Sequence, residues 1–427
     1  MKQRTIKRNG LAAVIVLLMN VHLHAQDTVR ITLREAEKQF LEKNLALLAE
    51  RYNVDIARAG VIQASLYSNP NLSLTGNIYN PQEKKPFDIS SGTGEYIIQV
   101  QQLIRLAGKR NKEIGLAVTN GQLSENRFFD LMRTLRFSLR SNFFNAYYTL
   151  NSVNAYQSQL ASLEKLNAAY EGLQSQGIVT LKDALRIKSL LYSLKGEQTT
   201  LLNQLNDIQA DLRVLLQNNK ATFIPVAEER DDSLSASLKQ LDLARLIDTA
   251  YAYRHDLLLA NNNLLYSRQN YALQKALATP DLQLGAQFDK RGSFVENASF
   301  LTLAMDLPFF HRNQGNIKAA RIAISQNEII YKQQMELVEN EVRRAYAKAL
   351  TTDNMLSYVD PGFRDQFEKL LQGITENFQK KNISLIEFTD FYESYKNNIL
   401  QFNQLGNDRM QAIEALQFSV GKPIFSH

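Results

Sequence analysis

The sequence predicts a mainly α-helical fold with a small β part, in which two long helical hairpins alternate with two β-hairpins. Three observations support this prediction. Apolar residues recur at three- and four-residue steps over very long stretches, two short segments alternate strictly between apolar and polar residues, and the whole pattern occurs twice with a period of roughly 210 residues. A period this long indicates a duplicated half rather than a solenoid of short repeats.

The first residues indicate export. Four cations precede an apolar run from Leu11 to Leu18, and His24-Ala25-Gln26 follows it. This order is typical of a secretory signal peptide that is cleaved after Ala25, and the run is far shorter than the roughly 20 residues of a membrane-spanning helix. An uncleaved membrane anchor is the alternative interpretation.

The composition excludes several classes of protein. The chain has no cysteine, which excludes disulfides, thiolate metal sites and a lipidated cysteine after the signal. It has 49 Lys and Arg against 43 Asp and Glu, and because four of the basic residues lie in the signal, the remainder carries a net charge of about +2. This balance gives no reason to expect nucleic-acid binding. No later apolar stretch reaches the roughly 18 residues of a spanning helix.

Four segments follow from these patterns. They are a signal peptide (1–25), a first repeat (26–216), a linker (217–237) and a second repeat (238–427). In the first repeat a helical stretch leads to Asn69-Pro70-Asn71-Leu72, and in the second an equivalent stretch leads to Thr279-Pro280-Asp281-Leu282. The linker contains Pro225 and a run of charged residues.

Each of these prolines is followed by the period-two pattern of a strand with two different faces. Leu72, Leu74 and Ile78 share one face in the first repeat, and Leu282, Leu284, Ala286 and Phe288 share one in the second. Return strands are expected at 96–104 and 300–307, joined through polar tips at 81–94 and 290–297. Strands of about 9 to 11 residues cross a bilayer in a closed barrel, although a two-sided soluble sheet would show the same alternation.

Two long helices follow the hairpins. The first is predicted at 109–174 and would extend on the order of 100 Å. The second is predicted at 316–379, with an interruption at Asp360-Pro361 because proline breaks a helix. Each helix ends in a short turn and returns. Gly177 and Asn382 suit the left-handed cap, whereas Thr180 and Ser384 suit the start of the next helix.

In this order and spacing the pieces resemble the TolC-like outer-membrane efflux family over essentially the whole chain after the signal. The resemblance is carried by Asn69–Leu74, by Gly108-Lys109-Arg110, by the two tip turns and by the tandem halves. The segment from Leu307 to Ile317 is most similar to the cobalt-zinc-cadmium and copper cation-efflux branch. Members of the copper branch often carry a lipidated cysteine, which this chain lacks.

The resemblance implies a homotrimer in the outer membrane. Each chain would contribute four transmembrane strands to a 12-stranded β-barrel, with apolar faces toward outer-membrane lipid, and the helical hairpins would form an α-barrel in the periplasm. The family implies a passive exit duct, not an enzyme, that receives heavy-metal cations from an inner-membrane pump of the RND type through a periplasmic membrane-fusion adaptor. Alternatives are a duct for drugs, small amphiphiles or type I secretion, and a periplasmic coiled-coil structural or adaptor protein without a pore.

Charged residues just past the tips are candidates for the periplasmic entrance. Glu387 and Asp390 lie three residues apart on one helix face, where the family often has an acidic pair. In a trimer they would form rings of carboxylates that attract cations and respond to pH and salt. Asp183 and Arg186 occupy the corresponding steps in the first repeat. The alternative is an ordinary solvated helix face, with Asp183 paired to Arg186 or Lys182.

The turns themselves are candidates for docking the adaptor, because exposed apolar residues at a turn favour a partner. These residues are Gly177, Ile178, Val179, Thr180, Asn382, Ile383 and Ser384. The alternative is that the apolar members only close the end of the coiled coil. The three histidines after the signal lack paired ligand spacing, and no phosphate loop or catalytic triad is found, so no metal site, cofactor or catalytic residue is predicted.

Overall fold

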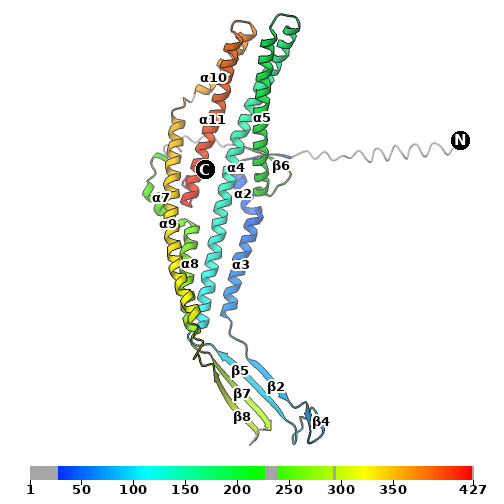
Figure 1. Cartoon of the computed structure of the whole chain (residues 1–427), viewed down its shortest axis with the longest axis vertical. Helices are drawn as coiled ribbons and strands as arrows, with labels where there is room; N and C mark the ends of the chain where they lie inside the picture. Colours follow the sequence, from blue (N-terminus) through cyan, green and yellow to red (C-terminus); the bar gives the residue numbers. More distant parts are fainter. Residues whose placement is uncertain (1–26, 227–237, 292–294, 361, 426–427) are drawn as a thin grey trace, which may run out of the picture. The chain divides into compact units, whose positions relative to one another are not determined.

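The computed structural model describes residues 27–226, 238–291, 295–360 and 362–425. The predicted signal peptide and residues 227–237 of the predicted linker lie outside them. The described chain forms two compact units, and each is built from three separate segments. Unit 1 comprises 27–44, 139–226 and 360–407 without 361, and unit 2 comprises 45–138, 238–359 without 292–294, and 408–425. Figure 1 colours these segments by their position in the sequence. Each unit therefore draws on both halves of the sequence.

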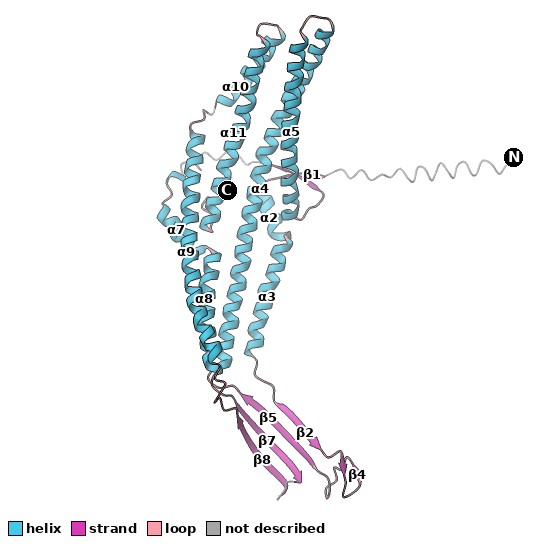
Figure 2. Ribbon diagram, in the orientation of Figure 1, coloured by secondary structure: helices cyan, strands magenta, loops and turns pink. Residues whose placement is uncertain are grey.

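The order of elements is the one that the sequence predicts. A helix, a strand pair, a long helix and a returning helix occur twice (Figure 2). The first set is α3 (Leu45–Ser65), β2 (Asn71–Gly76), β5 (Tyr96–Ile104), α4 (Lys109–Ser175) and α5 (Leu181–Leu216). The second is α8 (His255–Leu277), β7 (Leu282–Arg291), β8 (Glu296–Met305), α9 (Gln314–Ser357), α10 (Phe363–Gln379) and α11 (Leu385–Val420).

The four strands form one antiparallel sheet in unit 2, in the order β2-β5-β7-β8. Its central pair, β5 and β7, joins the two halves of the sequence. One register row crosses all four strands through Leu72, Val100, Ala286 and Leu301, and the next row runs through Ser73, Gln99, Gln287 and Phe300. The predicted alternation is therefore confirmed in these rows apart from Phe300, and the apolar row is open to solvent in the single chain, with Leu301 78% exposed.

The helices confirm the predicted rods. α4 is unbroken over 67 residues, and the second rod is interrupted between α9 and α10, where Asp360 accepts hydrogen bonds at its side chain from the Gly362 amide (2.9 Å) and at its carbonyl from the Phe363 amide (3.0 Å). Within the described residues, no helix is both long enough and apolar enough to cross a membrane.

Unit 1 contains a strand pair that the sequence pattern did not reveal. β1 (Asp27–Ile31) pairs in parallel with β6 (Ala221–Pro225), so part of the predicted linker is a strand. Next to β1, α2 (Leu33–Lys43) begins with a capping box between Thr32 and Glu35. Five-residue strands whose partners are far apart in sequence leave little periodic signal.

The core of unit 1 is one cluster shared by both helical hairpins. The apolar residues that recur at three- and four-residue steps along α4 are buried there, and aromatic residues of α10 and α11 pack against them. Its buried members are Tyr156, Leu160, Leu163, Leu166, Ile187, Leu191, Leu194, Leu371, Phe378, Phe388, Tyr392, Tyr395 and Ile399. This cluster supports the two turns that the sequence singled out.

Candidate functional site

The first tip is the turn between α4 and α5, at residues 176–180. Gly177 lies in the left-handed region (φ +73°), as predicted. The Ile178 amide donates to the Leu173 carbonyl (3.0 Å) and the Gly177 amide to the Gln174 carbonyl (2.9 Å). This pattern satisfies the last carbonyls of the helix and reverses the chain.

The second tip is the turn between α10 and α11, at residues 380–384, and here one prediction is wrong. Lys381, not Asn382, is the left-handed residue (φ +62°). The Asn382 amide instead closes the turn by donating to the Asn377 carbonyl (2.9 Å), which is the role of Ile178 in the first tip. Asparagine tolerates positive φ, but the hydrogen bond that closes this turn places that conformation one residue earlier, at Lys381.

Both tips begin the returning helix with the same hydrogen-bond motif. Thr180 accepts from the Asp183 amide (3.1 Å), and its hydroxyl donates to the Asp183 carboxylate (2.7 Å). Ser384 accepts from the Glu387 amide (3.2 Å), and its own amide donates to the Glu387 carboxylate (2.8 Å). The predicted capping roles of Thr180 and Ser384 are confirmed. Two of the proposed entrance carboxylates therefore also stabilise helix starts.

The capping contact sets the charge of Glu387. Hydrogen bonds from the Ser384 backbone amide and then from its side chain hold the pKa of Glu387 below its usual value. Glu387 is therefore fully ionised at neutral pH in the single chain.

Asp390 and Arg186 occupy equivalent places, one turn into α11 and α5. Both are exposed, as is Glu387. Phe388 and Thr389, between the two carboxylates, are buried, so Glu387 and Asp390 lie on the solvent side of α11. Exposed carboxylates on one side of α11 fit both an entrance ring and an ordinary solvated helix face.

Stacked aromatic rings connect the two tips. Tyr170 of α4 stacks on Phe378 of α10 (centroids 5.6 Å apart), and Phe378 stacks on Phe388 of α11 (4.4 Å). Burial, and then the nearby charge of Asp183, raise the pKa of Tyr170. Phe378 and Phe388 were missed in the sequence, although their spacing from the turn could have indicated an inward face.

The predicted docking residues divide into two groups. Ile383 packs against the core of unit 1 and Val179 is half-buried. Ile178 is 54% exposed. Three neighbouring apolar residues outside the predicted docking set are also exposed, namely Leu181, Leu185 and Ile386. Ile178 therefore represents the accessible apolar surface of the tips better than Ile383 does.

A polar contact set links the helices below the tips. The Tyr156 hydroxyl donates to one oxygen of Glu197 (2.7 Å), and the Lys396 ammonium donates to the other (2.9 Å). Burial raises the pKa of Glu197, but these hydrogen bonds outweigh it and leave the pKa below its usual value. No sequence motif marks the set, because its members come from α4, α5 and α11.

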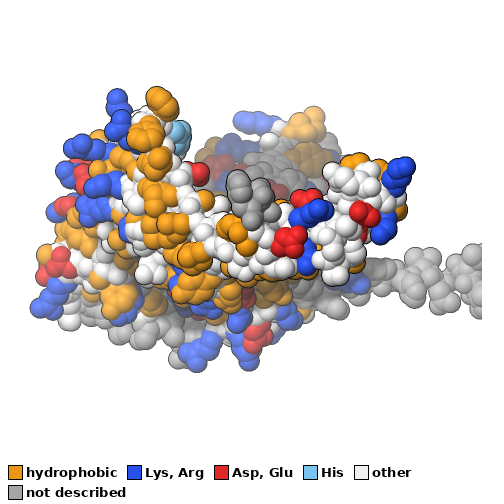
Figure 3. Space-filling model, turned by 90° about the horizontal axis from the view of Figure 1, so that it is seen from below, with side chains coloured by type: hydrophobic (Ala, Val, Ile, Leu, Met, Phe, Trp, Pro, Cys, Tyr) orange, Lys and Arg blue, Asp and Glu red, His pale blue; other side chains and the backbone are white. Residues whose placement is uncertain are grey.

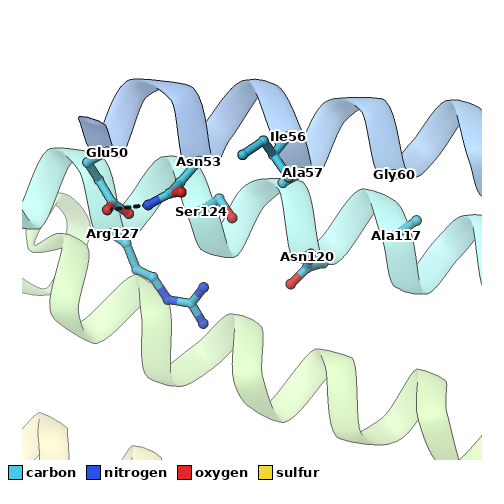
Figure 4. Close-up of a pocket in the computed structure, with 9 residues that line it drawn as sticks. All are labelled: Glu50, Asn53, Ile56, Ala57, Gly60, Ala117, Asn120, Ser124 and Arg127. Carbon is cyan, nitrogen blue, oxygen red and sulfur yellow. Dashed lines mark hydrogen bonds between the residues drawn. The ribbon is translucent and has the colours of Figure 1, made fainter. Parts of the chain in front are cut away.

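Unit 2 contains an open groove of about 600 Å³ between α3 and α4 (Figure 4). Gly60, Ala57 and Ala117 line one part of it, and Asn53 donates to Glu50 (2.8 Å) in another. No group of three or more His, Cys, Asp or Glu in the described part of the chain has a metal-binding arrangement.

Comparison with known sequences finds similarity to efflux proteins over part of the chain. Residues 37–218 match the family model described as Outer membrane efflux protein. The chain is 28% identical over 195 residues to Outer membrane protein TolC of Escherichia coli (strain K12), covering 42% of this chain and 39% of that protein. It is 27% identical over 194 residues to TolC of Salmonella enteritidis, covering 42% and 38%. The chain thus matches about two fifths of the length of these curated relatives.

Solved structures share the fold over nearly the whole chain. A membrane protein from Pseudomonas aeruginosa has a TM-score of 0.71 at 18% identity, covering 91% of this chain and 92% of that one. The structure of CusC has a TM-score of 0.71 at 16% identity, and the match covers 92% of this chain and 92% of that one. The CmeC outer membrane channel of Campylobacter jejuni has a TM-score of 0.71 at 13% identity, covering 91% of this chain and 85% of that one. The predicted fold class, mainly helical with a small sheet, is confirmed.

Proposed function

We propose that this chain is a member of the TolC-like outer membrane efflux protein family, whose model its residues 37–218 match, and that it is the passive exit duct of a tripartite efflux system. The family is not enzymatic, and its members lie in the outer membrane with their helical part in the periplasm. A duct needs no catalytic residue, because the pump supplies the energy.

The two open edges of the sheet carry this proposal. β2 and β8 end the strand order, so within the described chain each has one side without a strand partner. Backbone groups in lipid must be paired, and a sheet with two free edges satisfies this only by closing. Because the four strands alternate in direction, β8 of one copy meets β2 of the next in the antiparallel sense.

Three copies give the number of strands that a duct requires. Four strands cannot surround a pore, and even eight leave an interior that side chains fill. Twelve strands in a ring of three copies leave a water-filled lumen. The row of Leu72, Val100, Ala286 and Leu301 then meets lipid, while Ser73, Gln99 and Gln287 face the lumen.

A helix in the same unit supports this ring. α3 buries Leu47, Val54 and Ala57 on one side, yet it exposes a second apolar row on the opposite side, formed by Leu45, Leu48, Tyr52 and Ile56. A helix with two apolar faces requires two partners. The neighbouring copy supplies the second.

Heavy-metal cations are the proposed cargo. The support is the resemblance of Leu307–Ile317 to the cation-efflux branch and the exposed, ionised Glu387 beside Asp390. Cations are conducted past these carboxylates rather than coordinated. Drugs and small amphiphiles are the competing cargo, and a type I secretion duct has the same fold.

The proposed partners follow the order of transport. An RND-type pump in the inner membrane passes cargo to a periplasmic membrane-fusion adaptor, and the adaptor docks its own helical hairpin on the two tips. Exposed Ile178 and Ile386 supply the apolar surface for this contact.

Single-channel conductance in a planar bilayer tests the duct and its entrance together. Glu387→Gln with Asp390→Asn removes two charges per copy and keeps an acceptor for the Ser384 amide. Asp207→Asn with Asp211→Asn, at exposed sites on α5 far along the chain from the tip, is the matched control. We expect a small cation-selective conductance that loses selectivity only in the first variant.

The outcomes separate the alternatives. Unchanged ion selectivity in the Glu387/Asp390 variant would exclude an entrance role for these two residues, but it would not contradict the proposed duct. A folded protein that gives no conductance in any form would instead favour a periplasmic structural or adaptor protein without a pore.

A further inference from the structure

The tip of the first strand hairpin exposes three large apolar side chains. Ile78 and Ile89 are each 73% exposed and Phe87 is 71% exposed. They surround the short pair β3 (Tyr79–Asn80) and β4 (Lys85–Pro86). The Phe87 amide donates to the Ile78 carbonyl (3.0 Å), so these two residues are neighbours across the pair. An exposed cluster of this kind on a small loop is typical of a contact surface.

A buried carboxylate holds this loop in shape. Asp88 is only 5% exposed and accepts hydrogen bonds from four groups. They are the Ser90 amide (3.1 Å), the Ser90 hydroxyl (2.7 Å), the Thr93 hydroxyl (2.7 Å) and the Asn80 side-chain amide (3.1 Å). These bonds, led by the Ser90 hydroxyl, hold the pKa of Asp88 far below its usual value. The loop is therefore ordered by its own contacts.

The same contacts fix the direction of the apolar side chains. Asp88 points inward, so its neighbours Phe87 and Ile89 are left outside. Phe87 also has a left-handed backbone (φ +50°), which costs about 1 kcal/mol or more for a bulky residue. The exposed ring of Phe87 is therefore presented by a backbone conformation that is unfavourable for a bulky residue.

We propose that Ile78, Phe87 and Ile89 dock into the interfacial zone of the outer leaflet and anchor this end of the sheet to the lipid surface. The inference rests on the proposed function, which places the sheet in the outer membrane. Ile78 continues the sequence spacing of Leu72 and Leu74 and lies two residues beyond Gly76, the last paired residue of β2.

The charges beside the cluster match this occupant. Lys84 and Lys85 are exposed on the same short hairpin, where the Lys85 ammonium also lies 4.0 Å from the Glu83 carboxylate. Figure 3 shows basic, acidic and hydrophobic side chains together on the lobe at its right. Long basic side chains reach lipid phosphates while adjacent aromatic and aliphatic side chains enter the boundary of the acyl chains.

Tryptophan fluorescence tests the proposal, because the chain has no tryptophan of its own. Phe87→Trp, in full-length protein reconstituted in bilayers, places one probe in the cluster. Leu301→Trp, at a site 78% exposed on the apolar row of the sheet, is the reference for the proposed membrane-embedded face. Leu185→Trp, at the first helical tip, is the reference for solvent. Quenching by lipids with brominated acyl chains is measured for each.

We expect the probes at 87 and 301 to lose half or more of their emission and the probe at 185 to be unaffected. Quenching at 301 but not at 87 would overturn the lipid contact and leave the proposed duct standing, and a blue-shifted, unquenched probe at 87 would indicate a protein partner instead. Absence of quenching at both sites would overturn the membrane placement itself. If Phe87→Trp does not fold, Ile89→Trp provides the same readout.

Discussion

The ring of Tyr170 on α4 lies against the ring of Phe378 on α10, with centroids 5.6 Å apart and planes inclined by 10°. Phe378 is 4% exposed and also stacks on Phe388 of α11. The contact joins the two helical hairpins close to both tips. Through this contact, α4 of one hairpin packs against α10 and α11 of the other, close to the proposed entrance residues on α11.

Phe378→Ala should destabilise unit 1 strongly. The change removes a buried ring and leaves a cavity between hairpins, which costs about 3–5 kcal/mol. Denaturant unfolding followed by helical circular dichroism measures the loss. Tyr192→Ala, at a site 60% exposed on α5, is the control and should change stability by about 0.5 kcal/mol or less. Equal effects at the two sites would show that the stack is not a structural contact.

Gly406→Ala is expected to destabilise the protein. A Cβ there would lie 2.6 Å from the ring of Tyr148, so this ring would have to move, at a cost of about 1–3 kcal/mol. Gly172 on α4 has no atom within 4 Å of the same position, and Gly172→Ala should stabilise the helix by about 0.5–1 kcal/mol. Thermal unfolding of the two variants should move in opposite directions, and a stabilising Gly406→Ala would contradict the close approach.

The contacts of Glu197 predict a pH dependence. Because its pKa lies below the usual value of 4.5, it stabilises the fold above that pH, and the contribution is lost as the pH falls through the lower native pKa. Glu197→Gln should therefore flatten the decline in melting temperature between about pH 5 and pH 3. The control is Glu164→Gln, whose pair with Lys195 (2.7 Å) joins the same two helices but is half-exposed, so it should change little. A wild-type slope in Glu197→Gln would refute the assignment.

A buried ion pair should dominate the junction between sheet and helices in unit 2. The Lys109 ammonium, almost fully buried, donates to the Asp281 carboxylate (2.7 Å) and to the Thr279 carbonyl (2.6 Å). Lys109→Met removes the nearest cation from Asp281, which keeps the hydrogen bond from the Leu106 amide and the more distant charge of Arg105, and should cost about 3 kcal/mol. Adding Asp281→Leu should restore part of this loss, because the uncompensated charge is removed. A double variant less stable than Lys109→Met in denaturant unfolding would argue against this account.

Adaptor docking should depend on Ile178 rather than on Ile383. Ile178→Asp places a charge on an exposed apolar contact and should lower crosslinking to a co-expressed adaptor about tenfold or more, without loss of membrane insertion. Val214→Asp makes the same change at a 64% exposed site at the other end of α5 and should have no effect. Ile383→Asp should instead lower stability, because Ile383 packs on the core. Normal crosslinking in Ile178→Asp would exclude docking at this residue.

Much of the tip geometry could be predicted because it is local. The left-handed Gly177 and the caps at Thr180 and Ser384 follow from residue type and spacing. The left-handed Lys381 could not be predicted, since a lysine carries no preference for that conformation and the hydrogen-bond ring imposes it. The Ser384 amide donates to the Glu387 carboxylate, as the capping-box spacing of these two residues indicates, whereas the sequence pattern had suggested only an entrance role for Glu387.

By itself the sequence determined the elements of this protein and their order. The 67-residue α4, the break at Asp360 and the two faces of the strands are encoded in periodicities of 3.6 and 2, which any stretch of chain displays without its partners. Only the tertiary structure decided the pairings: β1 with β6, β5 with β7, and Tyr170 with Phe378. A periodic pattern specifies which face of an element is buried, whereas the segment that covers this face is selected by packing across hundreds of residues.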